Sequence, residues 1–403
     1  MHTLLKVAGW LAGVGMLLLA GAWITSPDPR VNPASFEDEP LSMQLAPLAE
    51  AITLAQVERE SGAVATLLVL EFDDEVARVV DLSRETGSPS DDPFAVLARL
   101  SDQRIASLAA GGPSEAVPIA RLRSAGGTGT RHIATGTNFP EHAEEAASEA
   151  VFSFPKFGPP LPARTGVEGR DDVLLDYEVE LCMRFDRPIE SVDDFDAAVK
   201  GLFLCGDFTD RATLVRLIDP DNLDSGSGFS DGKSRTDFYP TGAFLVIPRD
   251  WRAFVRGERM MTFVNGEARQ DARGGEMTLD FRALAAKALG DMDRPRFLYR
   301  GDYYRLSPEP RIVPGMTLMS GTAEGVIFTP PSRGDIIEGG ARYLFSGAWA
   351  SGGNPVDTII ETFIGNELAS HHFLQPGDVV AFRSSRLGNI LVEVTAGGAA
   401  PSR

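Results

Sequence analysis

Positive charge and cysteine are both scarce in this chain of 403 residues. Lysine and arginine total 38 against 57 aspartates and glutamates, which leaves a formal net charge of −19 at pH 7. This balance argues against electrostatic binding to nucleic acid or to an anionic membrane surface. The two cysteines, Cys182 and Cys205, are too few for the disulfide framework of a small secreted domain. With 43% hydrophobic and 24% charged residues, the composition is that of a globular protein.

One long apolar run lies near the N-terminus. Residues 7–25 contain no charged side chain over nineteen positions, a length that fits either a secretory signal peptide or a membrane anchor. We therefore interpret 1–25 as a signal peptide or membrane anchor and the Pro-rich segment 26–42 as a linker. The body is then expected outside the cytoplasm, either periplasmic or anchored in the membrane and facing outward; a cytoplasmic location is the alternative.

The rest of the chain divides into two regions by its pattern. Residues 43–125 contain a helical spacing in MQLAPLAEAITLAQV, a buried strand in VATLLVLEF and a second helical stretch, which predicts a small α+β domain. From 131 to 398 short β-rich runs alternate with Gly and Pro turns, and few strong helices appear. The predicted fold class is α+β, mostly β.

Two carboxylates interrupt an apolar run in LLDYEVELCMRF, residues 174–185. On a strand, Glu178 and Glu180 share one face with Cys182. Adjacent buried carboxylates repel each other and lose hydration, so a cation is expected between them. Asp207 ends another apolar run, and three carboxylates without a nearby His or Cys cluster favour Mg²⁺, Mn²⁺ or Ca²⁺ over zinc.

The two cysteines lie on the same two apolar runs. If the runs pair antiparallel with Asp207 opposite Glu180, then Cys205 falls opposite Cys182. The thiols would then be neighbours behind the carboxylates. Two small core residues that do not touch are the alternative, and this pattern leaves both open.

His142 and Glu145 lie three residues apart in GTNFPEHAEEAASEA. Pro140 and the alanines predict a helix there, with Asn138 as its cap. A carboxylate that holds an imidazole makes it a better general base toward water. An exposed His–Glu pair without function is the alternative, and from the spacing alone it is the more common case.

Lysine is used sparingly, with five residues against thirty-three arginines. The lysines that occur are therefore informative. Lys156 follows the aromatic run FSFP, and Lys233 ends a Gly- and Ser-rich loop. A compact ammonium can stabilise a developing oxyanion where a guanidinium does not fit. Both are candidates for such a role.

Eight strings together resemble the fumarylacetoacetate hydrolase family over residues 131–395, in the family's order. They are GTNFPEHAEE, FPK, LLDYEVEL, CGDFTDR, DGKSRTDFYPTGAFLV, VNGEARQ, SGTAEGV, and LQPGDVV with LGNI. The resemblance implies a mixed β-sheet roll that pairs as a homodimer. It also implies Mg²⁺ or Mn²⁺ as the cofactor, and small 2-oxo acids or 1,3-dicarbonyl compounds as substrates.

The resemblance also assigns roles to nine residues. These are metal ligation by Glu178, Glu180 and Asp207, activation of water by His142 with Glu145, charge stabilisation by Lys156 and Lys233, and substrate contact by Asn138 and Thr322. One departure bears on the substrate. The family's extra metal-binding aspartate is replaced by Thr135, as in the acylpyruvase-like branch.

The implied activity is hydrolysis of a C–C bond in an acylpyruvate-type 2-oxo acid, with water activated by the His–Glu pair as the nucleophile. The same fold also serves decarboxylases, isomerases and hydratases of 2-oxo acids. A non-catalytic protein that binds a metal or an oxo acid is a third hypothesis. No nucleic-acid partner is expected, and residues 7–25 could attach the protein to a membrane.

Overall fold

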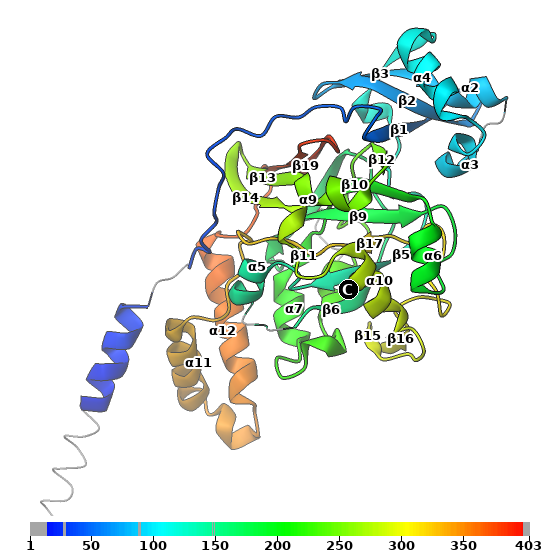
Figure 1. Ribbon diagram of the computed structural model, residues 1–403. Helices are drawn as coiled ribbons and strands as arrows, with labels where there is room; N and C mark the ends of the chain where they lie inside the picture. The colour runs from blue at the N-terminus through cyan, green and yellow to red at the C-terminus, as the bar shows by residue number, and fades with distance from the viewer. Residues whose placement is uncertain (1–13, 27–29, 88–89, 147, 149, 398–403) are drawn as a thin grey trace, which may run out of the picture.

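Two sheets form the body of the protein (Figure 1). The computed structural model describes residues 14–26, 30–87, 90–146, 148 and 150–397. The larger sheet has ten strands in the spatial order β4 (Ser114–Pro118), β3 (Val76–Asp81), β2 (Val64–Phe72), β1 (Ala51–Glu58), β12 (Leu245–Pro248), β10 (Lys200–Gly206), β9 (Val179–Phe185), β17 (Leu318–Met319), β5 (Arg131–Gly136) and β6 (Phe152–Phe157). The second sheet has five strands, β14 (Glu267–Arg273), β13 (Arg259–Val264), β18 (Val379–Ser384), β19 (Asn389–Ala396) and β7 (Arg164–Gly169).

Two short strand pairs and a set of mostly short helices complete the described chain. The strand pairs are β8 (Leu175–Asp176) with β11 (Thr209–Asp210), and β15 (Phe297–Tyr299) with β16 (Asp302–Tyr304). The α-helices are α2 (Leu82–Thr86), α3 (Pro93–Leu97), α4 (Asp102–Gly111), α5 (Pro140–Glu145), α6 (Val192–Ala197), α7 (Arg211–Leu217), α8 (Phe229–Lys233), α9 (Trp251–Gly257), α10 (Phe281–Leu289), α11 (Arg333–Phe345) and α12 (Pro355–Ser370). Single 3₁₀ turns lie at η1 (Ile119–Arg121), η2 (Leu223–Ser225), η3 (Gly274–Glu276) and η4 (Ala348–Ser351).

The two sheets pack face to face around the central strands. Every residue of β9 and β10 is buried, as expected for strands covered on both faces. Phe208, just after β10, packs its ring 5.9 Å from that of Phe382 in β18. The predicted class, α+β and mostly β, is confirmed.

The N-terminal strands extend the large sheet. β1 pairs with β12 and sets Leu54 opposite Leu245, and buried side chains from both regions form one continuous core. The helical pattern expected in 43–57 is wrong in its second half, because β1 occupies Ala51–Glu58. Pairing with strands on both sides outweighs the weak local preference of these residues for a helix.

The register of β9 and β10 differs from the expected one by two residues. Cys205 lies opposite Glu180, and the Asp207 amide donates to the Glu178 carbonyl at 2.9 Å. Asp207 is therefore opposite Glu178 and not Glu180. A slip of two keeps every side chain on its face, because the strand period is two. Cys182 and Cys205 are consequently still close enough to form a disulfide, with Cα atoms 6.0 Å apart.

The N-terminal apolar run is described only in part. Residues 14–24 form a helix, and residues 7–13 of the run lie outside the described chain. Within the described ranges no helix combines the length and the hydrophobicity that crossing a bilayer requires. Beyond this helix, the linker lies along the body from Asn32 to Glu39. Hydrogen bonds between the linker and the body, from side chains as well as backbone groups of both, hold it there.

Candidate metal centre and active site

Three carboxylates converge at one end of the central strands. Glu180 lies on β9, Glu178 precedes that strand, and Asp207 follows β10. All three are buried, and one oxygen from each lies within 4.8 Å of the others. The structure therefore brings together the three side chains that the sequence singled out as metal ligands.

Three cations already neutralise part of this charge. Lys233 Nζ lies 2.8 Å from Glu178 Oε2 and 3.0 Å from Asp207 Oδ2. Lys156 Nζ lies 2.6 Å from Asp207 Oδ1 and also donates to the backbone carbonyl of Lys233. Arg211 Nη2 lies 2.8 Å from Glu178 Oε1. Each oxygen still has a second lone pair that a cation can use.

The two lysines differ in their pKa directions because the charges around them differ. Burial lowers the pKa of Lys156, Asp207 compensates only in part, and the charge of Lys233 lowers it further. Burial acts on Lys233 in the same direction, but Asp207 and Glu178 together outweigh it and raise its pKa. Lys233 is thus held firmly as an ammonium at the carboxylates.

Glu180 carries the open position of the cluster. Its Oε2 accepts the Gly321 N–H at 2.9 Å; Gly321 has φ +78°, which suits glycine. Its Oε1 is buried and has no hydrogen-bond partner among the described residues. Burial raises the pKa of Glu180 well above its ordinary value, and the charges of Asp207 and Glu178 raise it further. A bare, buried carboxylate oxygen beside two others is the donor set of a hard divalent cation, so the residues fit a Mg²⁺ or Mn²⁺ ion.

Asp176 and Arg211 support the cluster from behind, and sequence reasoning missed both. Arg211 Nε lies 2.8 Å from Asp176 Oδ2, while Asp176 also accepts the backbone N–H groups of Ile327 and Phe328 at 3.0 and 3.1 Å. The pair thus ties the metal strand to the segment that contains Thr322. Both residues stand in the strings LLDYEVEL and CGDFTDR, but nothing local shows that they meet.

His142 and Glu145 form a pair on α5 at the edge of the same cavity. His142 Nδ1 is 2.9 Å from Glu145 Oε2, and the side chains are only 12% and 6% exposed. The alternative of an exposed pair is therefore wrong. Glu145 Oε1 accepts the Gly325 N–H at 2.9 Å. Burial raises the pKa of Glu145, opposed by its bond to His142. Glu145 fixes Nδ1–H as the donor, which leaves Nε2 as the basic nitrogen.

Asn138 and Thr322 make mainly structural contacts. The Asn138 amide donates to the carbonyls of Leu279 and Ser320, at 3.0 and 2.8 Å, and it is absent from the cavity lining. Its predicted role as helix cap is wrong, since Phe139 is the cap residue of α5. Thr322 does line the cavity, but its hydroxyl donates to the Val179 carbonyl at 2.9 Å.

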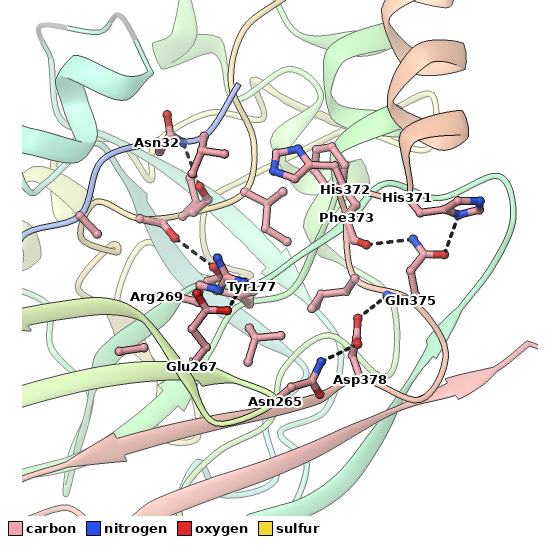
Figure 2. A pocket seen from close by; sticks show the side chains of 18 of the residues that line it. Asn32, Tyr177, Asn265, Glu267, Arg269, His371, His372, Phe373, Gln375 and Asp378 are labelled. Carbon is pink, nitrogen blue, oxygen red and sulfur yellow. Dashed lines mark hydrogen bonds and ion pairs between the residues drawn. The ribbon is translucent and has the colours of Figure 1, made fainter. Parts of the chain in front are cut away.

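The cavity connects these groups. It has a volume of about 80 Å³ and is lined at one end by His142, Glu145, Glu178, Lys233 and Thr322. Lys156 is fully buried behind it and does not line it. A larger cavity of about 460 Å³ lies apart from the carboxylates, between the linker, Asn265 and the pair His371 and His372 (Figure 2).

The comparisons with known proteins place the chain among relatives of the same fold. A family model described as "Fumarylacetoacetate (FAA) hydrolase C-terminal" matches residues 131–395, more than half of the chain. A solved fumarylacetoacetate hydrolase from the psychrophilic Exiguobacterium antarcticum is 17% identical with a TM-score of 0.50, and the match covers 86% of this chain and 100% of that one.

Two solved mycobacterial structures are similar as well. A 2-hydroxyhepta-2,4-diene-1,7-dioate isomerase from Mycobacterium marinum is 16% identical with a TM-score of 0.47, covering 86% of this chain and 99% of that one. A 5-carboxymethyl-2-hydroxymuconate delta-isomerase from Mycobacterium smegmatis is 18% identical with a TM-score of 0.47 and the same coverage. A search of curated proteins finds no match. The family match establishes that the chain belongs to the fumarylacetoacetate hydrolase family, whose members are enzymes.

Proposed function

We propose that the protein is a divalent-metal-dependent hydrolase that cleaves a C–C bond in an acylpyruvate-type 2-oxo acid. One observation carries the proposal: the partnerless buried oxygen of Glu180 lies in a cluster with Glu178 and Asp207, and the His142–Glu145 pair faces the same cavity as Glu178. A carboxylate oxygen buried without a partner is costly unless a ligand completes it.

Glu178, Glu180 and Asp207 would hold Mg²⁺ or Mn²⁺, with Ca²⁺ as a further possibility. The bound ion would supply Lewis-acid stabilisation of an enolate oxygen. The protein's own residues would do the rest. His142 Nε2 would accept a proton from water that attacks the acyl carbonyl, and Glu145 would stabilise the imidazolium that forms. Lys233 would balance the negative charge that develops beside Glu178.

Lys156 would act differently from Lys233. It is fully buried, and its contacts are with Asp207 and with the backbone carbonyl of Lys233. It would therefore position both groups and would not touch the substrate. Lys156 and Lys233 therefore have different proposed roles, although the sequence assigned both to charge stabilisation.

The three-carboxylate set supports the acylpyruvase-like branch. Thr135 lines the cavity, and its hydroxyl donates to the Met319 carbonyl at 2.8 Å. In the described chain the group Glu178, Glu180 and Asp207 is the one cluster of three or more possible metal ligands. Position 135, where the family's extra metal-binding aspartate would stand, is a threonine. Its hydroxyl is already hydrogen-bonded to the Met319 carbonyl.

The test is turnover of 2,4-dioxo acids by metal-stripped protein with added Mg²⁺ or Mn²⁺, followed by loss of enol absorbance and by product identification. Pyruvate plus a carboxylic acid is the expected outcome, and His142→Ala should lower kcat by roughly 10²-fold or more. Isomerised or decarboxylated product would contradict hydrolysis and support one of the other reactions of this fold instead. Metal binding without turnover in either protein would support a binding function instead.

Export and dimerisation are separate proposals. The disulfide Cys182–Cys205 and the charge-free segment 7–25 support a location outside the cytoplasm, where disulfides persist. Protease accessibility tests this. Protease should reach the protein in osmotically opened cells and should not reach it in sealed, inverted inner-membrane vesicles, whose periplasmic face lies inside. Sedimentation of the detergent-solubilised protein tests the homodimer that family membership suggests.

A further inference from the structure

The cavity beside the carboxylates has a polar end and an apolar end. The apolar end is built from β6, α7 with the residue after it, α8 and the loop that precedes α11. Its main lining residues are Phe152, Phe154, Leu214, Ile218, Phe229 and Phe328. The Phe229 ring lies 4.7 Å from that of Phe152 and 5.3 Å from that of Phe154. These contacts give the apolar end a continuous aromatic wall.

The positive charges in the lining are already used. Among its described lining residues, Arg211 and Lys233 are the two basic ones besides His142. Arg211 pairs with Asp176 and Glu178, and Lys233 pairs with Glu178 and Asp207. A carboxylate placed among the phenylalanines would therefore be buried without a partner, which is strongly unfavourable.

We propose that the acyl group of the substrate is apolar, an alkyl or aryl chain without a second carboxylate. The proposal rests on the proposed function, because it assigns the rest of the substrate once the 2-oxo acid end lies at the carboxylate cluster. Each methylene buried in the apolar end should raise kcat/KM roughly fourfold until the cavity is filled. Apolar sites discriminate weakly between neighbouring chain lengths but strongly against an unpaired charge.

The experiment compares acetyl-, butanoyl- and pentanoylpyruvate with succinylpyruvate, which ends in a carboxylate at nearly the length of the pentanoyl chain. We expect kcat/KM to rise along the alkyl series and to fall at least 100-fold from pentanoyl- to succinylpyruvate. In Ile218→Ala the gain per methylene should shrink, and in Ile218→Arg the preference between the last two substrates should narrow or reverse. The metal-induced rise in melting temperature checks that each variant is folded.

The outcomes separate the two proposals. No turnover of any substrate with Mg²⁺ or Mn²⁺ would contradict the proposed function itself. Turnover of acetylpyruvate together with equal or better use of succinylpyruvate would leave the proposed function standing and overturn the apolar acyl group. A flat alkyl series would overturn it as well.

A second, independent observation concerns the hairpin of α11 and α12. Its tip exposes large apolar side chains, with Phe345 90% and Trp349 61% exposed, and residues 343–356 contain no charged side chain. Exposed apolar clusters of this kind mark interaction sites. The base of the hairpin is packed differently, because Phe363 and Ile364 of α12 are buried against α7.

The apolar helix 14–24 starts from the same place as this hairpin. Ser26 Oγ accepts the Gly334 N–H at 3.0 Å, so the end of that helix lies beside the start of α11. Figure 1 shows both elements extending away from the sheets on the same side of the body. The helix exposes Leu17 and Ile24, among other apolar side chains.

We infer that the hairpin tip docks on a lipid surface, together with the apolar helix 14–24 beside it. Aromatic side chains on an uncharged loop suit the interface between headgroups and acyl chains. The net charge of −19 favours a zwitterionic surface over an anionic one. Continuity with the apolar N-terminal helix makes lipid a better occupant than a second copy of the chain.

The test uses the full chain with a polarity-sensitive dye on Phe345→Cys, since Cys182 and Cys205 are bonded to each other. Ser114→Cys, exposed on the edge strand β4, is the matched control. With phosphatidylcholine vesicles we expect a blue shift at position 345 and none at 114. Vesicle-bound protein without a shift at 345 would overturn the inference. A shift that grows with protein concentration in the absence of vesicles would do the same, because it would show that a second copy covers the tip.

Discussion

Two buried glutamates of this protein differ in how their oxygens are used. Glu258, between α9 and β13, is fully buried. Its Oε1 accepts from the hydroxyls of Ser384 and Ser385 and from the Arg386 N–H, while its Oε2 lies 2.8 Å from Arg386 Nε. Glu180 is buried to the same extent, but its Oε1 has no partner in the described chain. A satisfied carboxylate holds structure together, whereas an open one has room for a ligand.

Two histidines show the same contrast. His132 Nε2 donates to the Gly158 carbonyl at 3.1 Å, and its Nδ1 accepts the Thr317 N–H at 3.2 Å. Among the residues that the structure describes, His142 bonds only through Nδ1, to Glu145, and it faces the cavity. Burial alone therefore does not identify a functional group. In both pairs the candidate site residue is the one with an unused polar atom.

The largest expected effect comes from Glu180→Gln, with Glu258→Gln as its matched control. Glu180→Gln should lower kcat/KM by roughly 10³-fold or more and leave the free energy of unfolding of the metal-free protein unchanged or higher. The reason is that burial already favours the neutral form of Glu180. Glu258→Gln should cost about 3 kcal/mol of stability, because it removes the buried carboxylate of Arg386 and leaves only the exposed Glu50, 3.5 Å from Nη1. Equal losses of stability in Glu180→Gln and Glu258→Gln would contradict the distinction between an open and a satisfied carboxylate.

Metal binding should stabilise the wild-type protein and not the Glu180→Gln variant. A ligand that binds only the folded state adds about 2.7 kcal/mol at a hundred times its Kd. Denaturant unfolding with EDTA, then with saturating Mg²⁺ or Mn²⁺, measures this. Stabilisation of both proteins to the same extent would mean that the ion binds elsewhere.

His132 gives a pH dependence that distinguishes it from His142. Burial lowers the pKa of His132 to about 3, and its bond to the Gly158 carbonyl only partly offsets this. The unfolded chain binds the proton near pH 6.5, so the folded state loses stability as pH falls from about 6.5 toward 3, by at most about 1.4 kcal/mol per pH unit. In His132→Gln this part of the slope should vanish. The difference between the proteins at pH 8 gives the pH-independent cost of losing the ring, and an unchanged slope would contradict the prediction.

The metal cluster could be predicted from the sequence because its residues follow the two-residue period of a strand. Glu178, Glu180 and Asp207 stay on the site side even though the actual register differs from the expected one by two positions. The same tolerance explains why the cysteines still meet. Local pattern was sufficient here, since apolar flanks on both strands left few other arrangements.

The remaining features depend on contacts between distant segments. Nothing local indicates that Asp176 and Arg211 pair, or that the Asn138 amide is used by the Leu279 and Ser320 carbonyls. The strand β1 was expected as part of a helix because its pairing partner β12 lies almost two hundred residues away. Burial of the His142–Glu145 pair is equally non-local, since the Gly325 N–H that completes it comes from another loop.

The smallest expected effect concerns the segment 325–328, which is held from both sides. Asp176 bonds its backbone from inside, and the Asn32 amide of the linker donates to the carbonyls of Val326 and Phe328, at 2.9 and 2.7 Å, from outside. Asn32→Ala should cost about 1 kcal/mol of stability and raise KM a few-fold, because the segment also contacts Glu145 and lines the cavity.

Asn354→Ala is the control for this prediction. The Asn354 side chain caps α12 and accepts the Val356 N–H at 3.0 Å, so its loss should also cost about 1 kcal/mol of stability. Asn354 lies away from the segment 325–328, and its replacement should leave KM unchanged. If both variants lose stability and only Asn32→Ala changes KM, the linker is part of the active-site framework. If neither variant changes KM, the linker is not part of the active-site framework. It then only connects the N-terminal helix to the body.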